Sequence, residues 1–239
     1  MTFSKSEVNR AGRFFADQFR KAAAGERKVG EQRADVERTV EVIEWWRSEH
    51  ARPLSLASAS LGQYASEMGK PFVAQRLKKF PTIIGKLTRE PKTKLSRMGD
   101  IGGVRAVPPD QDAAYRVAEH LRRDWTIVKF HDYVSEPKAD GYRALHLIAR
   151  VQDRLIEVQL RTPLQDNWAN LAEILSRLGA PDLKFGGGPP QLREYLAVLS
   201  ETHMLREQGL PLDSSLHDRL WELQRLADTF VDNATDDSA

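Results

Sequence analysis

The chain has 239 residues, of which 41% are hydrophobic and 29% are charged, with a formal net charge of +2 and no cysteine. This balance is typical of a globular protein and excludes wholesale disorder, while the lack of cysteine excludes disulfides, thiolate metal sites and cysteine nucleophiles. No apolar run approaches the roughly 20 residues that cross a bilayer, and the N-terminus lacks the order of a signal peptide. The composition therefore predicts a cytoplasmic protein that is not inserted in a membrane.

Apolar side chains recur at helical spacing in residues 1–70, which we expect to form an N-terminal helical extension. One helix ends at the break before Gly25, a second covers residues 31–50 and is stopped by Pro53, and a third covers residues 56–68.

Residues 71–180 change to short segments rich in branched and aromatic side chains, which are typical of strands. The pattern contains strands at residues 101–107, 125–134, 144–151 and 155–160, with a helix over residues 112–123. The short loop between the last two strands favours an antiparallel hairpin. The predicted fold class is α/β in the α+β sense: a single core with a mixed, partly antiparallel sheet of about five strands, flanked by helices.

Helical patterns return after the last strand. They cover residues 164–178, 191–207 and 215–231, and the last two belong to a C-terminal helical region over residues 181–231. A polar tail over residues 232–239 is expected to be frayed.

A basic segment lies between residues 70 and 105, where ten Lys and Arg stand against two acids. Such a block suits a polyanionic ligand, a nucleotide or a nucleic acid, or else forms a solvated helical face. Within it, the cations of Arg76, Lys78 and Lys86 and the hydroxyl of Thr82 could surround phosphates. The spacing is not that of a Walker A loop, and an ordinary basic turn is the alternative.

Two acids stand on or beside predicted core strands. Asp100 opens the strand over residues 101–107, and Glu157 lies within the strand over residues 155–160. A buried carboxylate is costly unless it is paired or binds a metal, so the two acids could hold Mg²⁺ beside a triphosphate. The alternative is that Glu157 faces solvent and Asp100 caps a turn.

A loop between two strands brings a tyrosine, Tyr142, to the rim of the predicted sheet. An aromatic ring there could stack on a base, a contact worth roughly 1–3 kcal/mol in nucleic-acid systems. Tyr142 could instead cap the core, and His146 could be a core histidine with its hydrogen bonds satisfied.

In this order, the blocks resemble the synthetase domain of the RelA/SpoT family, the alarmone synthetases, over residues 76–173. The resemblance implies a mixed sheet related to nucleotidyltransferases, and an enzyme that uses Mg²⁺ to transfer the β,γ-pyrophosphate of ATP to a ribose 3′-hydroxyl. Because the sequence leaves no room for the hydrolase domain of the long members, we expect synthesis and no degradation.

The resemblance also gives roles to the residues that match the family. The adenine would lie between Arg76 and Arg105, and the ATP phosphates would meet Lys78, Lys86 and Thr82, the last standing where the family usually has serine. The catalytic acids and magnesium ligands would be Asp100 and Glu157. The acceptor would meet Lys138, Tyr142, His146, Gln159 and Arg161.

One block departs from the family pattern. The family commonly has Trp-Ala-x-x-Glu-His, whereas this chain has Trp168-Ala169-Asn170-Leu171-Ala172-Glu173, so the Glu-His pair is missing in register. Together with residues 4–12, this favours the toxic small alarmone synthetases, whose acceptor is the 3′ CCA end of tRNA and which imply an antitoxin partner. Cations outnumber acids in residues 1–28, a stretch that could hold a tRNA backbone or could equally be the outside of a helix. The alternatives are GDP or GTP as acceptor, and a catalytically inactive nucleotide- or RNA-binding module, against which the two retained acids argue.

Overall fold

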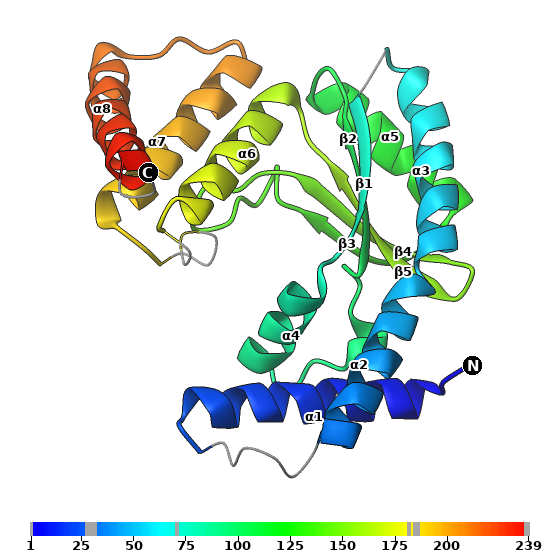
Figure 1. Ribbon diagram of the computed structural model, residues 1–239. Helices are drawn as coiled ribbons and strands as arrows, with labels where there is room; N and C mark the ends of the chain where they lie inside the picture. Colours follow the sequence, from blue (N-terminus) through cyan, green and yellow to red (C-terminus); the bar gives the residue numbers. More distant parts are fainter. Residues whose placement is uncertain (1, 27–32, 70–71, 181–182, 184–186, 237–239) are drawn as a thin grey trace.

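The computed structural model in Figure 1 describes residues 2–26, 33–69, 72–180, 183 and 187–236. Its helices are α1 (Lys5–Ala23), α2 (Arg33–Ser48), α3 (Ala51–Ser66), α4 (Phe80–Arg89), α5 (Gln111–Asp124), α6 (Pro163–Arg177), α7 (Pro190–Glu207) and α8 (Ser214–Asp236), with a 3-10 turn at Leu95–Arg97. Its strands are β1 (Phe72–Leu77), β2 (Gly102–Val107), β3 (Thr126–Asp132), β4 (Leu145–Val151) and β5 (Arg154–Leu160). Within the described ranges, no helix is both long and apolar enough to cross a membrane.

The five strands form one sheet in the order β1-β2-β5-β4-β3. β2 and β5 run parallel, with Gly103 opposite Glu157, and the other neighbouring strands run antiparallel. The mixed, partly antiparallel sheet expected from the sequence is therefore confirmed. β5, the last strand in the chain, lies at the centre of the sheet.

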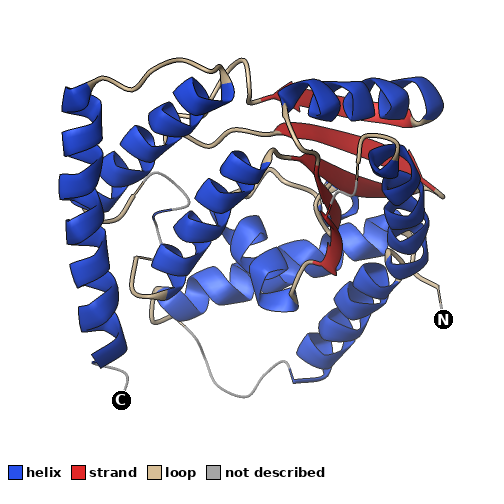
Figure 2. Ribbon diagram, turned by 90° about the horizontal axis from the view of Figure 1, so that it is seen from above, coloured by secondary structure: helices blue, strands red, loops and turns tan. Residues whose placement is uncertain are grey.

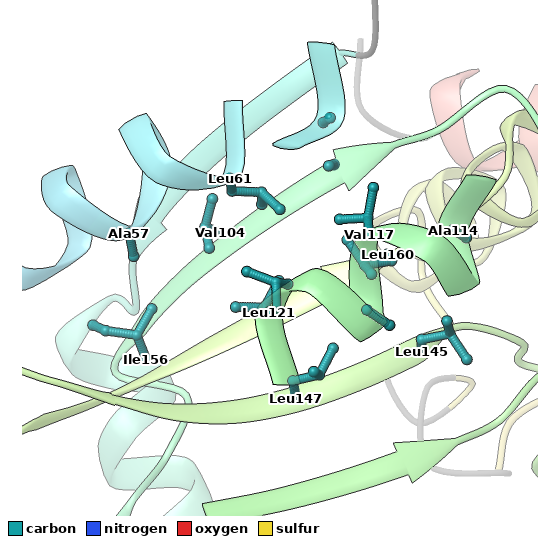
Figure 3. Packing of buried hydrophobic residues seen from close by; sticks show 14 of the residues in the cluster. Ala57, Leu61, Val104, Ala114, Val117, Leu121, Leu145, Leu147, Ile156 and Leu160 are labelled. Carbon is teal, nitrogen blue, oxygen red and sulfur yellow. The ribbon is translucent and has the colours of Figure 1, made fainter. Parts of the chain in front are cut away.

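One face of the sheet is apolar and is covered by α3 and α5 (Figure 3). Because side chains alternate along a strand, every second residue points to this face, among them Val104, Leu147 and Val158, of which none is more than 1% exposed. Leu61 of α3 and Leu121 of α5 pack against them and have no exposed surface. Burial of one such side chain stabilises the fold by about 1.5–3 kcal/mol, so this layer is a main source of stability.

The turn between β4 and β5 is two residues long, because Val151 pairs with Arg154. Gln152 and Asp153 between them have φ angles of 45° and 63°. Positive φ at both central residues is the geometry of a type I′ turn, whose twist matches that of the flanking strands. The antiparallel hairpin expected from the sequence is confirmed.

Two further apolar clusters hold the terminal helices together, and the helices of the two clusters lie apart from one another in Figure 1 (Figure 2 shows the molecule from above). The first unites α1, α2 and α4 through residues such as Val8, Ile43 and Ile83. The second unites α6, α7 and α8 through residues such as Leu196 and Leu223. The site described below therefore has helices of both groups at its borders.

The structure corrects three expectations. Helix α3 begins at Ala51 and not at residue 56, because Pro53 lies in the first helical turn, where a missing N–H costs little. Residues 72–89, in which no strand was expected, form β1 and α4. Helix α8 continues to Asp236, so most of the expected polar tail is helical, and its last three residues lie outside the described part, as do residues 31 and 32 of the second expected helix.

Candidate functional site

The second face of the sheet is polar and carries a cavity of about 320 Å³. Strand alternation places Arg105 of β2 beside Gln159 of β5, and Gly103 beside Glu157. Seven of the residues expected at the site line the cavity: Arg76, Lys78, Asp100, Arg105, Glu157, Gln159 and Arg161. The resemblance thus selected residues from three separate segments that the fold brings to one cavity.

Asp100 precedes β2 and lies between two lysines. Its Oδ2 accepts hydrogen bonds from Nζ of Lys78 at 2.9 Å and from Nζ of Lys86 at 3.1 Å. Its Oδ1 is buried and has no hydrogen-bond partner. Lys78 follows β1 and Lys86 lies on α4, so the two elements that the sequence pattern did not reveal bring these lysines to the acid.

Glu157 lies in the middle of β5, and only 18% of its side chain is exposed. Its Oε1 accepts from Nδ1 of His146 at 3.2 Å, and its Oε2 accepts from Nε2 of Gln159 at 2.7 Å. Burial raises the pKa of this carboxyl group, but the hydrogen bonds from His146 and Gln159 and the charges of His146 and Lys78 outweigh burial and lower the pKa to about 2. Glu157 is therefore ionised at neutral pH and does not face bulk solvent.

A chain of hydrogen bonds connects Glu157 with Tyr142. A carboxylate can only accept, so Nδ1 of His146 carries a proton and donates to Glu157, and Nε2 of His146 and the Tyr142 hydroxyl share a hydrogen bond of 2.6 Å. The Tyr142 oxygen accepts from Nη2 of Arg161 at 3.0 Å, and Arg161 also donates to Oε1 of Gln159 at 2.8 Å. Four of the five residues expected to meet the acceptor thus form one network with Glu157.

Arg76 and Arg105 lie on neighbouring strands of the polar face. Arg76 pairs with Gly103 and Arg105 pairs with Ala74, so the two arginines are diagonal neighbours, within reach of each other for long side chains. Nη1 of Arg105 is 2.9 Å from Oδ1 of Asp166. The arginines are placed on one face, as their expected role around a base requires.

Asp166, in the first turn of α6, was not expected at the site. Its Oδ1 contacts both Arg105 at 2.9 Å and Nη1 of Arg161 at 3.3 Å, so it joins the residues expected to bind ATP with those expected to bind the acceptor. An acid in the first turn of a helix is ordinarily read as an interaction with the helix dipole. No signal in the sequence distinguishes this acid from such a residue.

The remaining expected residues lie at the margin. Thr82, in the first turn of α4, is exposed and does not line the cavity. Lys138 is also exposed, and its Nζ lies 4.7 Å from the ring centre of Tyr133 and 4.8 Å from that of Tyr142. On α6, the cavity is also lined by Asn170, Glu173 and Arg177. These residues lie three and four positions apart and so share one face of the helix. If one of them had been known to lie at the site, the spacing would have predicted the other two.

The carboxylates fit a magnesium ion. Across the described residues, no three His, Asp or Glu side chains converge as a ready-made metal cage. Mg²⁺ usually binds one or two carboxylates and takes its other ligands from water and substrate phosphates. Asp100 and Glu157 line the same cavity, and the buried Oδ1 of Asp100 is free to bind a cation.

Comparisons with known proteins identify similar chains. A family model described as "Region found in RelA / SpoT proteins" matches residues 75–176. The GTP pyrophosphokinase YwaC of Bacillus subtilis is 37% identical over 151 residues, which are 56% of this chain and 70% of YwaC. The Mycobacterium tuberculosis protein Rv1366 is 30% identical over 172 residues, 66% of this chain and 58% of Rv1366, so the chain spans less than two thirds of that relative.

Among solved structures, the small alarmone synthetase 2 of Bacillus subtilis matches with a TM-score of 0.54 and 28% identity, over 65% of this chain and 90% of that one. The five-stranded mixed sheet with its polar, basic face defines a domain of the small alarmone synthetase type. The chain belongs to the RelA/SpoT family.

Proposed function

We propose that the chain is a pyrophosphokinase, which transfers the β,γ-pyrophosphate of ATP to a ribose 3′-hydroxyl and releases AMP. The observation that carries this proposal is that Asp100 and Glu157 line one cavity together with Arg76, Lys78 and Arg105. Two acids among several cations form the set of groups that positions a metal-bound triphosphate. The resemblance to a GTP pyrophosphokinase supports the same chemistry.

On the donor side, Mg²⁺ held by Asp100 and Glu157 would supply charge neutralisation for the pyrophosphate that is transferred. Lys78 and Lys86, which donate to Asp100, have further N–H groups for phosphate oxygens. Arg76 and Arg105 flank the adenine, and Thr82 meets the polyphosphate from α4.

On the acceptor side, Tyr142 stacks on the base, with the ammonium group of Lys138 over the same ring. The acceptor hydroxyl oxygen attacks the β-phosphorus, the bond from that phosphorus to the oxygen bridging to the α-phosphorus breaks, and AMP leaves with the electron pair. Glu157, ionised at neutral pH, binds the metal or takes the proton of the hydroxyl. Catalysis then depends on positioning and charge neutralisation.

We favour the 3′ CCA end of tRNA as the acceptor, which makes the chain a translation-inhibiting toxin held in check by an antitoxin. The exposed cations Arg10, Arg13 and Lys21 of α1 support an RNA partner, because cations on phosphates release counterions. Helix α1 packs against α4, the helix of Lys86. The alternative acceptor is GDP or GTP, which the relationship to YwaC favours.

Release of AMP from ATP, measured with magnesium and each acceptor for wild type and Glu157→Gln, tests the catalytic proposal. We expect release by wild type and none above background by the variant. No AMP with any acceptor would leave only a nucleotide- or RNA-binding module.

The acceptor is identified with ATP labelled at the γ-phosphate, offered in parallel to GDP, GTP and deacylated tRNA. Label in the 3′ end of tRNA is the expected result, and affinity for tRNA should fall as salt rises. Label confined to guanosine nucleotides would exclude the tRNA acceptor.

A further inference from the structure

Tyr142 is fixed by a helix that lies outside the residues matched to the family. The match ends at residue 176 and α7 begins at Pro190. Both neighbours of Tyr142 in the chain, Gly141 and Arg143, bind side chains of α7. The chain is therefore held to α7 both immediately before and immediately after Tyr142.

The first contact joins Gly141 to Ser200. The Ser200 hydroxyl donates to the carbonyl oxygen of Gly141 at 2.5 Å. Gly141 has a φ angle of 88°, and a Cβ at this position would lie 2.9 Å from Cβ of Ser200. The backbone thus approaches α7 more closely than any residue with a side chain could, in a conformation that favours glycine.

The second contact joins Arg143 to Glu207. Both side chains are buried, at 4% and 8% exposure, and Nη1 of Arg143 lies 2.9 Å from Oε2 of Glu207. Glu207 also accepts from Nε2 of Gln111 at 2.7 Å and from the hydroxyl of Thr162. A buried pair of this kind resists separation, because separation would leave a charge unpaired.

The ring of Tyr142 is also connected to α7, through Trp168. It packs edge-on against Trp168, with 5.9 Å between ring centres, and Nε1 of Trp168 donates to the carbonyl oxygen of Leu196 on α7 at 2.6 Å. The backbone on either side of Tyr142 and, through Trp168, the ring of Tyr142 are therefore held by the same helix, α7. No residue of α7, which the structure describes throughout, lines the cavity that holds Arg76 and Asp100.

We infer that Ser200 and Glu207 of α7 are positioning residues for the acceptor, because they fix Tyr142 in the place where the acceptor base is to stack. The inference rests on the proposed function. Since α7 does not line the cavity expected to bind ATP, loss of these contacts weakens the use of the acceptor and leaves the use of ATP unchanged.

The test compares Ser200→Ala and Glu207→Gln with the control Glu194→Gln, which alters an exposed pair with Arg219 on the side of α7 that faces α8. The KM for the acceptor, measured with GDP and with deacylated tRNA, should rise about fivefold in Ser200→Ala, the factor that about 1 kcal/mol of lost hydrogen bonding corresponds to. The KM for the acceptor should rise further in Glu207→Gln. The KM for ATP should match wild type in both variants, and in Glu194→Gln the KM for the acceptor and the KM for ATP should both match wild type.

Amide hydrogen exchange of residues 138–144, measured without substrates, gives a second readout that does not depend on activity. Exchange there should be faster in Ser200→Ala, with exchange in β2 unchanged. An unchanged exchange rate in Ser200→Ala, or an equal rise of both KM values, would overturn the inference. If wild type transfers pyrophosphate to no acceptor, the proposed function fails, and the exchange rates alone decide whether α7 holds this segment.

Discussion

The two faces of the sheet are made by the same strands and differ in almost every physical respect. Val158 points to the apolar face and has no exposed surface, while its neighbour Glu157 points to the cavity and carries a charge. One face is filled by α3 and α5, and the other is left open for a ligand. A residue that stabilises the core is thus the direct neighbour in β5 of a residue expected to be catalytic. A shift of β5 by one residue would turn Glu157 to the apolar face and Val158 to the cavity.

The largest effect that distinguishes the faces is expected for Glu157→Gln. The variant keeps the shape of the side chain but removes the negative charge, so pyrophosphate transfer should fall about 10²–10⁴-fold. Kinetics of AMP release would measure it, with circular dichroism to show that the fold is kept. Activity above a tenth of wild type would mean that the polar face is not the catalytic one.

The counterpart on the apolar face is Leu147→Ala. Leu147 is fully buried against the helices, and truncation of a buried leucine to alanine costs about 2–5 kcal/mol. Urea unfolding should show this loss, while kcat of the molecules that remain folded should stay near wild type. A lower kcat at full stability would mean that the two faces are not separate in function.

A smaller effect is expected for Asp166→Asn, which removes the charge shared by Arg105 and Arg161. Hydrogen bonds to charged groups contribute about 1.5–3 kcal/mol, so kcat/KM should fall by about 10- to 100-fold for both substrates. Asn170 donates to Asp166 at 3.1 Å, and Asn170→Ala, which leaves the charge of Asp166 in place, should lower kcat/KM less than Asp166→Asn. A loss confined to one substrate would contradict a role for Asp166 on both sides.

The smallest expected effect concerns pH and the border of the apolar face, where His50 precedes α3. Burial lowers the pKa of His50 to about 4, against a partly opposing hydrogen bond to the Trp46 carbonyl. Below pH 6.5 the unfolded chain binds a proton that the folded chain does not, so stability falls as pH drops from 6.5 to about 4. The slope is at most about 1.4 kcal/mol per pH unit.

Urea unfolding at several pH values would show a steeper decline in wild type than in His50→Gln, in which the lowered pKa values of His131 and His203, both caused first by burial, still contribute. An equal decline in the variant would assign the pH dependence to other groups.

The central strands could be predicted from the sequence because alternation of polar and apolar side chains is a local property. β1 could not, because it is an edge strand with little burial, and its extended form depends on pairing with β2. In α4, Pro81 and Gly85 suggest a turn, yet the proline lies in the first helical turn, where it is tolerated.

The same distinction holds for the site. Asp100, Glu157 and the arginines belong to short motifs, so a resemblance could select them. Asp166 and Glu207 contact Arg105 and Arg143, which are far away in the chain, and only the tertiary structure brings these pairs together.

The central place of β5 also affects how the protein is made. The ribosome completes β1 with β2, and β3 with β4, before it adds the strand that separates these two pairs. A nascent chain that ends before residue 154 has neither Glu157 nor a strand between β2 and β4. Assembly of the sheet must then close a long stretch of chain in one late step, when β5 enters between β2 and β4.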